Sequence, residues 1–132
     1  MINKAHFSIL TLAVIFSFTL SGCKKDNIVS NEGSVVFWYG TNTSNELIDD
    51  GAVSLTYYVD GQIAGSTATN IFWTGTKGQE CGQDGSITIK KDIGVATNKT
   101  YEYRVIDQEG FEYWKGVVNF TKNSCEAVEL VW

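Results

Sequence analysis

The sequence predicts an all-β fold, a single small antiparallel β-sandwich of seven or eight strands. Three observations support this prediction. From Ser34 onward the apolar residues show no helical period. They fall instead into short runs rich in β-branched and aromatic residues. Clusters of glycine, asparagine and aspartate separate these runs at the spacing typical of sandwich domains. A composition of 43% hydrophobic and 19% charged residues is that of a folded chain.

Three strands are expected in the first half of this domain, at residues 34–39, 52–59 and 62–69. The second of them alternates clearly, with one face formed by Val53, Leu55, Tyr57 and Val59. Asp60-Gly61 follows directly, and this dipeptide is typical of a hairpin turn in which both central residues take positive φ. The polar segment Thr41–Gly51 is predicted to be a loop.

A short apolar segment, Ile71–Trp73, and a glycine-rich loop, Thr74–Gly85, lead into the second half. Gln108-Glu109-Gly110 is predicted to be a turn between two of its strands. The strands expected here are residues 86–90, 101–107, 111–120 and 126–132. Their inward-facing side chains are expected to be Ile87, Ile89, Tyr101, Tyr103, Val105, Val128, Leu130 and Trp132.

The segment Asn98-Lys99-Thr100-Tyr101-Glu102-Tyr103 resembles the start of a late strand in immunoglobulin-like and transthyretin-like domains. In those domains a loop precedes the strand and a tyrosine hydroxyl holds the loop in place. The resemblance implies a Greek-key arrangement of one of these two types.

An apolar segment precedes the expected domain. Phe7–Leu20 is a run of 14 uncharged residues that follows Lys4, and it is shorter than the roughly 20 residues that a membrane-spanning helix needs. It has the length of a signal-peptide core. The next residues, Leu20-Ser21-Gly22-Cys23, resemble the lipobox of bacterial lipoproteins. The resemblance implies that type II signal peptidase cleaves between Gly22 and Cys23, and that the Cys23 thiol carries a diacylglyceryl group.

This resemblance divides the chain into a signal peptide (1–22), a lipidated cysteine with a flexible tether (23–33) and the β domain (34–132). It implies a cell-envelope protein held by membrane lipid through its acylated, often palmitoylated, N-terminus. We expect attachment to the outer membrane of a Gram-negative cell. Lys24-Lys25-Asp26 resembles the signal that directs some lipoproteins to the cell surface. A solvated linker is the alternative reading of these three residues.

Cys81 and Cys125 are the two cysteines that remain after Cys23. In an exported chain two thiols are expected to form a disulfide, which would join the glycine-rich loop to the start of the last strand. A metal-binding pair is the alternative, but two cysteines without histidine supply too few ligands.

The residues also bear on catalysis and cofactors. His6 is the only histidine and lies in the predicted signal peptide, so histidine-based catalysis and histidine-ligated metals are excluded from the domain. No motif for a metal or cofactor is present.

Removal of Lys4 leaves nine basic against fifteen acidic residues, an acidic balance that argues against nucleic acid as a partner. The aspartates and the glutamate of the predicted turns favour turn formation over calcium binding or catalysis: Asp49, Asp50, Asp60, Asp84, Asp92 and Glu109.

Aromatic residues make up 13% of the chain, and several are adjacent pairs. Because neighbouring residues of a strand face opposite sides, one member of each pair is expected outside the main core. Tyr58, Trp73 and Trp114 are therefore candidates for a shared binding platform for a glycan or an envelope protein. The alternative is plain packing against the second sheet or loops.

Three hypotheses of function follow. The first is a non-enzymatic binding module that uses these aromatic residues. The second is a structural, inhibitory or immunity-type accessory protein that acts through Thr41–Gly51 or Thr74–Gly85. The third is a hydrolase that uses two carboxylates, which needs two acidic side chains facing one another across a groove.

Overall fold

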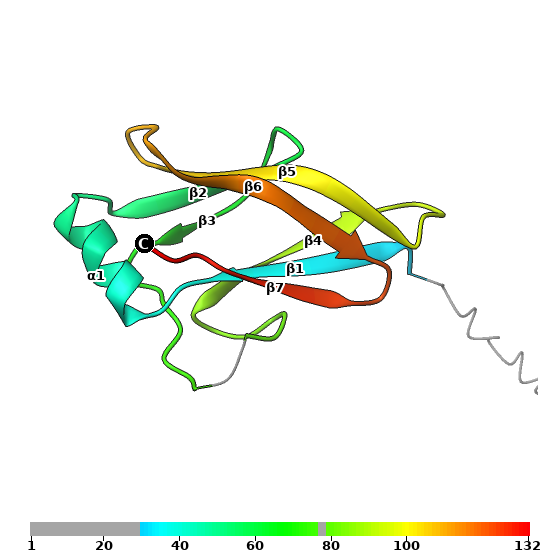
Figure 1. The fold of residues 1–132 in the computed structure, drawn as a ribbon, viewed down its shortest axis with the longest axis horizontal. Coiled ribbons are helices and arrows are strands. Elements are labelled where there is room, and N and C mark those ends of the chain that lie inside the picture. Colours follow the sequence, from blue (N-terminus) through cyan, green and yellow to red (C-terminus); the bar gives the residue numbers. More distant parts are fainter. Residues whose placement is uncertain (1–29, 77–78) are drawn as a thin grey trace, which may run out of the picture.

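Two β-sheets pack face to face in this computed structural model, which describes residues 30–76 and 79–132. One sheet has three strands in the order β4-β1-β7, and the other has four in the order β3-β2-β5-β6 (Figure 1). The described elements are β1 (Glu32–Trp38), α1 (Thr41–Asp49), β2 (Ser54–Val59), β3 (Gln62–Ala68), β4 (Ser86–Asp92), β5 (Asn98–Asp107), β6 (Glu112–Thr121) and β7 (Cys125–Glu129).

The all-β class and the sandwich are confirmed. The strand pairs are antiparallel except for one, because β7 pairs in parallel with β1. The chain crosses from β6 in one sheet to β7 in the other, and β7 then runs beside β1 in the same direction (Figure 1). The predicted hairpin between β2 and β3 is also confirmed, since Asp60 and Gly61 both have positive φ, of 56° and 71°.

The core lies between the two sheets and follows the alternation seen in the sequence. Phe37 of β1 contacts two tyrosines of the opposite sheet, with its ring centroid 5.6 Å from Tyr57 and 5.0 Å from Tyr103. β1, β2, β4, β5 and β6 each contribute core side chains of one parity, as the pleat requires. The buried apolar residues of this core are Val35, Phe37, Tyr39, Leu47, Ala52, Leu55, Tyr57, Val59, Ile89, Ile93, Tyr101, Val105, Val118, Phe120 and Leu130.

The prediction of a loop at Thr41–Gly51 was wrong, because most of this segment forms α1. Thr43, Ser44 and Leu47 are its buried residues, and they share one face of the helix. Two of the three carry hydroxyl groups, which hid the apolar pattern in the sequence. The Ser44 hydroxyl donates to the main-chain oxygen of Thr69 at 2.7 Å, so the polar atom is satisfied inside the protein.

Several element boundaries also differ from expectation. β1 begins at Glu32, inside the predicted tether, and Gly33 is buried there. A Cβ at Gly33 would lie 2.9 Å from Phe120, so this close approach needs glycine. Val53 precedes β2 and is 65% exposed instead of facing inward, and Trp132 follows β7 and is 54% exposed.

The loop-then-tyrosine resemblance does not fit the structure. Asn98, Lys99 and Thr100 are not a loop, because they already pair with β6 as part of β5. Tyr101 packs edge-on against Phe120 with ring centroids 5.6 Å apart. The ring of Tyr101 therefore belongs to the core, and the immunoglobulin-like or transthyretin-like subtype gains no support from this segment.

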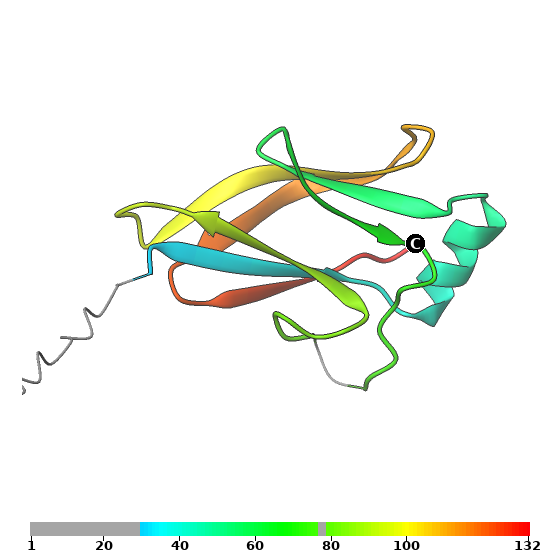
Figure 2. The same cartoon turned by 180° about the vertical axis from the view of Figure 1, so that it is seen from behind.

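The sandwich has two distinct ends. At one end, here called the Asn31 end, Ile93 donates its N–H to the oxygen of Asn31, and Asn123 donates to Glu32, so the β4–β5 loop and the β6–β7 turn meet the start of β1. At the other, the α1 end, lie α1, the β5–β6 turn and the segment after β7 (Figures 1 and 2). The predicted signal peptide, the lipobox and Cys23 lie outside the described residues. Within residues 30–76 and 79–132, no helix has the length and apolar character needed to span a bilayer.

Candidate binding site

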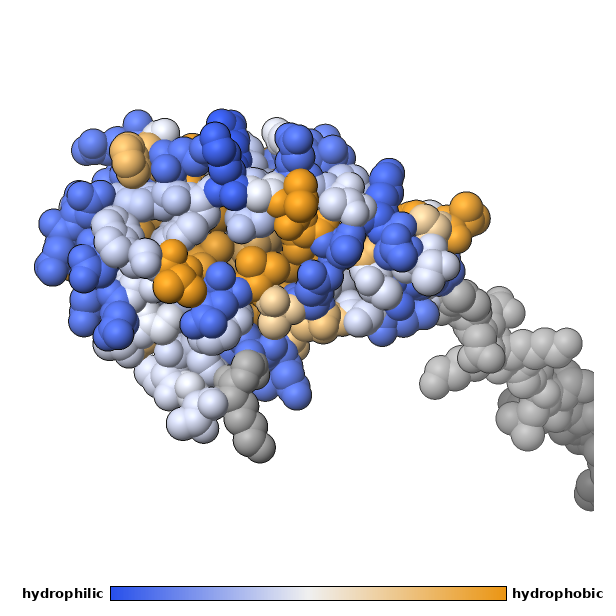
Figure 3. Space-filling view, in the orientation of Figure 1, coloured by the Kyte–Doolittle hydropathy of each residue, from blue (hydrophilic) through white to orange (hydrophobic). Residues whose placement is uncertain are grey.

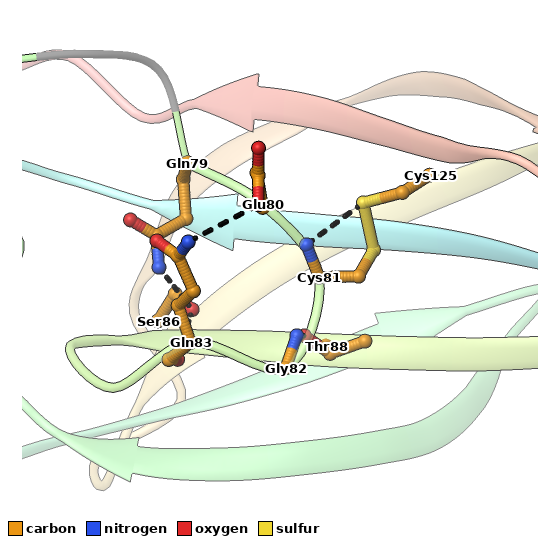
Figure 4. Close-up of a disulfide and its surroundings, with 8 residues drawn as sticks. All are labelled: Gln79, Glu80, Cys81, Gly82, Gln83, Ser86, Thr88 and Cys125. Carbon is orange, nitrogen blue, oxygen red and sulfur yellow. Dashed lines mark hydrogen bonds between the residues drawn. A yellow bond between two sulfur atoms is a disulfide. The ribbon is translucent and has the colours of Figure 1, made fainter.

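The predicted disulfide between Cys81 and Cys125 is present, with their Cα atoms 5.9 Å apart (Figure 4). It joins the glycine-rich loop to the first residue of β7, as expected. Figure 4 shows the loop lying over the three-stranded sheet. The N–H of Cys81 points at the Cys125 sulfur at 3.0 Å, and the N–H of Gly82 donates to the Thr88 hydroxyl at 2.7 Å.

The disulfide-linked loop, residues 79–85, covers the outer face of that sheet. Val36 alternates with the inward-facing Val35 and Phe37, so its side chain points outward. It is nevertheless 0% exposed. The neighbour of Val36 in β4 is Thr88, the residue whose hydroxyl accepts the loop N–H. This glycine-rich loop is therefore held beside the buried Val36 on the outer face of the sheet.

The structure does not bring Tyr58, Trp73 and Trp114 together. Tyr58 lies on the outer face of the four-stranded sheet, where the Arg104 guanidinium stacks 4.5 Å from its ring centroid. Trp114 pairs with the buried Val105 and lies on the inner side of the same sheet. Trp73 sits in the β3–β4 connection, where its main chain bonds to Tyr39. The three-residue platform is therefore not formed.

A β-bulge explains why the alternation rule failed at Trp114. The register of β5 and β6 shifts between Val105, which pairs with Trp114, and Ile106, which pairs with Glu112. Tyr113 is the extra residue, and an extra residue allows two neighbours to face one side of a sheet. Tyr113 and Trp114 are accordingly both half-buried, with ring centroids 5.7 Å apart.

These two residues are part of a cluster at the α1 end that surrounds a cavity. The Tyr113 ring centroid is 4.9 Å from that of Phe111 and 5.5 Å from that of Trp132. The aromatic cavity, as we call it, has a volume of about 510 Å³, within the usual range for small-ligand sites. Its lining residues are Asp50, Phe111, Glu112, Tyr113, Trp114, Val131 and Trp132.

Apolar residues of this cluster are open to solvent. Phe111 is 61% exposed, Val131 63% and Trp132 54%. Figure 3 shows apolar residues on the face where β6, β7 and the segment after β7 lie, flanked by hydrophilic residues. Grouped exposed apolar side chains in a soluble domain are typical of interaction sites.

Hydrogen bonds hold the walls of the aromatic cavity in place. The Tyr113 hydroxyl donates to Asp50 Oδ2 at 2.7 Å, and the Trp114 indole N–H donates to the oxygen of Val131 at 2.9 Å. The pKa of Tyr113 is raised well above its usual value by partial desolvation, then by the hydrogen bond to Asp50 and the charges of nearby carboxylates. Tyr113 therefore stays protonated and keeps donating to Asp50.

The β5–β6 turn is fixed to the α1 side of the cavity by a single glutamine. Gln108 accepts the N–H of Val53 at 3.0 Å and donates to the oxygen of Gly51 at 3.1 Å. Asp107 stabilises the same turn by accepting the N–H groups of Glu109 and Phe111, each at 2.8 Å. The turn that carries Phe111 is thus preorganised.

A second hollow, of about 430 Å³, lies on the outer face of the four-stranded sheet. Tyr58 and Arg104 line it together with Glu102 and Lys115. The Arg104 guanidinium already stacks on the face of the Tyr58 ring, and the lining carries both acidic and basic side chains. This groove has the character of an ordinary solvated sheet face.

The aspartates expected in turns have different partners, and Asp92 is the one among them that bonds to the main chain of its own turn. Asp60 pairs with Lys91 at 3.3 Å, and Asp92 accepts the N–H of Gly94 at 2.7 Å. Asp50 is bound to Tyr113. Across the part of the chain that the structure describes, no three histidine, cysteine or carboxylate side chains are grouped as a metal site would need.

Sequence reasoning selected Trp114 but missed the rest of the aromatic cavity. The sequence places Phe111 and Tyr113 in the strand expected at 111–120, and Trp132 on one face of the last strand with Val128 and Leu130. The one signal available was the run Phe111-Glu112-Tyr113-Trp114 directly after a glycine, because a bulge beside a turn is common in hairpins. No protein-family model matches the chain, and comparison with curated proteins and with solved structures found no significant similarity to it.

Proposed function

We propose that this protein is a lipid-anchored binding module of the bacterial cell envelope, and that the aromatic cavity is its binding site. The single observation that carries the proposal is the preorganised cavity at the α1 end, with three apolar residues of its rim more than half exposed. Exposed aromatic side chains in a concave, rigid setting are typical binding residues.

The position of the aromatic cavity fits the proposed anchor. Cys23 precedes Asn31, and Asn31 lies at the end of the sandwich opposite α1. A lipid on Cys23 would therefore hold the Asn31 end toward the membrane, and the cavity would face away from it. The ligand, a glycan or an envelope protein, would approach from the aqueous side.

Binding without catalysis is the activity we propose for the domain. His6 lies in the proposed signal peptide, and Cys81 and Cys125 are joined to each other. The alternative, an accessory protein that acts through Thr41–Gly51, would use the same cavity, because Asp50 of that segment lines it. For action through Thr41–Gly51 both hypotheses predict that the α1 end makes the contact, whereas action through Thr74–Gly85 would place the contact at the disulfide-linked loop.

Mass spectrometry of the protein purified from bacterial membranes tests the anchor. We expect a chain that starts at Cys23 and carries a diacylglyceryl group and a further acyl chain. The Cys23→Ser variant should lose both the lipid and its fractionation with membranes. A wild-type chain that is found unlipidated in the soluble fraction would contradict the proposed anchor.

Photo-crosslinking in intact cells tests the site. A photoreactive residue at Phe111 should give a specific adduct, and Trp132→Ala in the same chain should abolish it. The matched control is the same photoreactive residue at Val117, which is 68% exposed on the outer face of the four-stranded sheet. Equal adducts from both positions, or adducts at 111 that survive Trp132→Ala, would refute the proposed site.

A further inference from the structure

The aromatic cavity has the features of a site for a positively charged organic group. We propose that it binds the basic side chain, a guanidinium or an ammonium, of a protein partner. This inference rests on the function proposed above and names the chemistry of its ligand. Four observations support it: the tilt of the rings, the charge of the lining, the shortage of free donors and the exposed rim.

The rings form walls around the cavity instead of a flat surface. The Tyr113 plane is tilted by 40° to that of Trp114, by 43° to that of Trp132 and by 70° to that of Phe111. Rings of different tilt line the same hollow, and a cation is attracted to the ring face that it meets, because the face is the negative side of the quadrupole. Stacking on a sugar ring needs one open, flat face.

The charge of the lining is negative. Asp50 and Glu112 are the charged residues of the lining, and no basic side chain belongs to it among the described residues. Glu112 also lines the hollow on the outer face of the four-stranded sheet, where Lys115 pairs with it at 3.5 Å. Within the described part of the chain, Asp50 is therefore the carboxylate of the lining that has no basic partner. The raised pKa of Tyr113 has the carboxylates Asp50, Asp107 and Glu109 among its causes, so this region disfavours a further negative charge.

The lining offers acceptors but few donors. The Tyr113 hydroxyl and the Trp114 indole N–H are already used within the protein. Among the described lining side chains, the Trp132 indole N–H is the donor that remains. A sugar hydroxyl both donates and accepts, whereas a guanidinium or an ammonium only donates. The acceptor capacity left on Asp50 therefore matches a cation.

The rim indicates that the cation belongs to a protein. Phe111, Val131 and Trp132 are each more than half exposed around the acidic interior. A small free cation would leave this apolar rim in water. A polypeptide that inserts one arginine or lysine would cover it, which is the usual arrangement of an apolar contact region around a buried anchor.

NMR titration with two matched probes tests the inference. N-acetyl-arginine amide carries the cation, and N-acetyl-citrulline amide is its neutral isostere. The full chain is produced in bacteria and purified in a non-ionic polyoxyethylene detergent, which adds neither charge nor sugar. The indole signals of Trp114 and Trp132 should shift with arginine, while those of Trp38 and Trp73, which do not line the cavity, serve as references.

Variants separate the charge from the rings. Asp50→Asn keeps an oxygen for the Tyr113 hydroxyl but removes the negative charge, and we expect it to weaken arginine binding about fivefold. Trp132→Ala removes one wall, and we expect about a tenfold loss. Asp84→Asn changes the net charge of the chain equally, but Asp84 is exposed in the disulfide-linked loop, so binding should be unchanged. Added salt should weaken arginine binding.

Two results would overturn the inference. The first is citrulline binding as tightly as arginine, because the charge would then be irrelevant. The second is a neutral oligosaccharide that shifts the Trp114 and Trp132 signals at lower concentration than arginine does. If either occurs while the adduct at Phe111 still depends on Trp132, the site stands and the proposed ligand class is wrong. If that adduct is absent as well, the proposed function fails.

Discussion

Apolar side chains lie outside the main core at two places, and the two places differ in their exposure to solvent. Val36, on the outer face of the three-stranded sheet, is 0% exposed because the disulfide-linked loop lies over it. At the α1 end, Phe111 and Trp132 surround the aromatic cavity and remain 61% and 54% exposed. The first group is closed by a covalent link, and the second is held by hydrogen bonds and left open.

This difference fits a stabilising role for the first group and the proposed binding role for the second. Apolar area that is removed from water stabilises the fold by about 25 cal/mol per Å². Apolar area that stays exposed contributes nothing of this kind until a partner covers it. Substitutions under the disulfide-linked loop should therefore lower the free energy of unfolding, and substitutions at the cavity rim should lower affinity.

The largest effect is expected from the disulfide. Cys81 and Cys125 close a loop with a sequence separation of 44 residues. The loop-entropy relation gives about 4 kcal/mol of stabilisation for that length. The double variant Cys81→Ser with Cys125→Ser should lose about this amount in urea unfolding followed by tryptophan fluorescence. Arginine binding measured well below the melting temperature should not change. A double variant that is folded but no longer binds arginine would contradict the separation of stability from binding.

Val36→Ala tests the covered layer directly. The loss of two buried methyl groups should lower the free energy of unfolding by about 2 kcal/mol. The control is Val95→Ala, because Val95 is 100% exposed and its truncation should change stability by less than about 0.5 kcal/mol. Equal effects of the two substitutions would show that the disulfide-linked loop does not bury Val36 in solution.

A titration tests the bond that holds the cavity wall. Desolvation raises the pKa of Tyr113 most, and the hydrogen bond and the charge of Asp50 raise it further, since all three disfavour the phenolate. Asp50→Asn removes the charge, so the Tyr113 pKa should move down toward its usual value. Tyr39 is the reference, because its pKa of about 12 is set mainly by burial. Ring resonances followed by NMR between pH 9 and 12 should show Tyr113 titrating in the variant but not in the wild-type protein, while Tyr39 begins to titrate only near pH 12 in both. An unchanged Tyr113 pKa would mean that the contact with Asp50 is not formed.

Much of the fold was predictable because strand alternation and turn residues are local signals. Leu55, Tyr57 and Val59 face the core as their spacing indicates, and Asp60-Gly61 forms the expected hairpin turn. The disulfide was predictable from cysteine number alone. α1 was not, because Thr43 and Ser44 are polar in the sequence and become buried only through contacts such as the bond from Ser44 to Thr69.

The candidate site was predictable only in part. The aromatic pairs indicated that some rings lie outside the core, and Trp114 was among those chosen. The bulge that turns Tyr113 to the side of Trp114 depends on the register between β5 and β6. Asp50 and Trp132 reach the same place from distant parts of the chain. Register and long-range contacts are tertiary properties, which a pattern of local spacing does not contain.

The smallest effect on stability is expected from the residue with the largest proposed role in binding. Trp132 is 54% exposed, lies beyond β7 and contacts Tyr113 at 5.5 Å between ring centroids. Trp132→Ala should therefore cost no more than about 1 kcal/mol, the energy of one partly exposed aromatic pair. Urea unfolding would measure it beside the tenfold loss of arginine affinity expected above. A loss of 3 kcal/mol or more would place Trp132 in the structural layer with Val36, because a ring that the fold needs so strongly is packing and not an open binding surface.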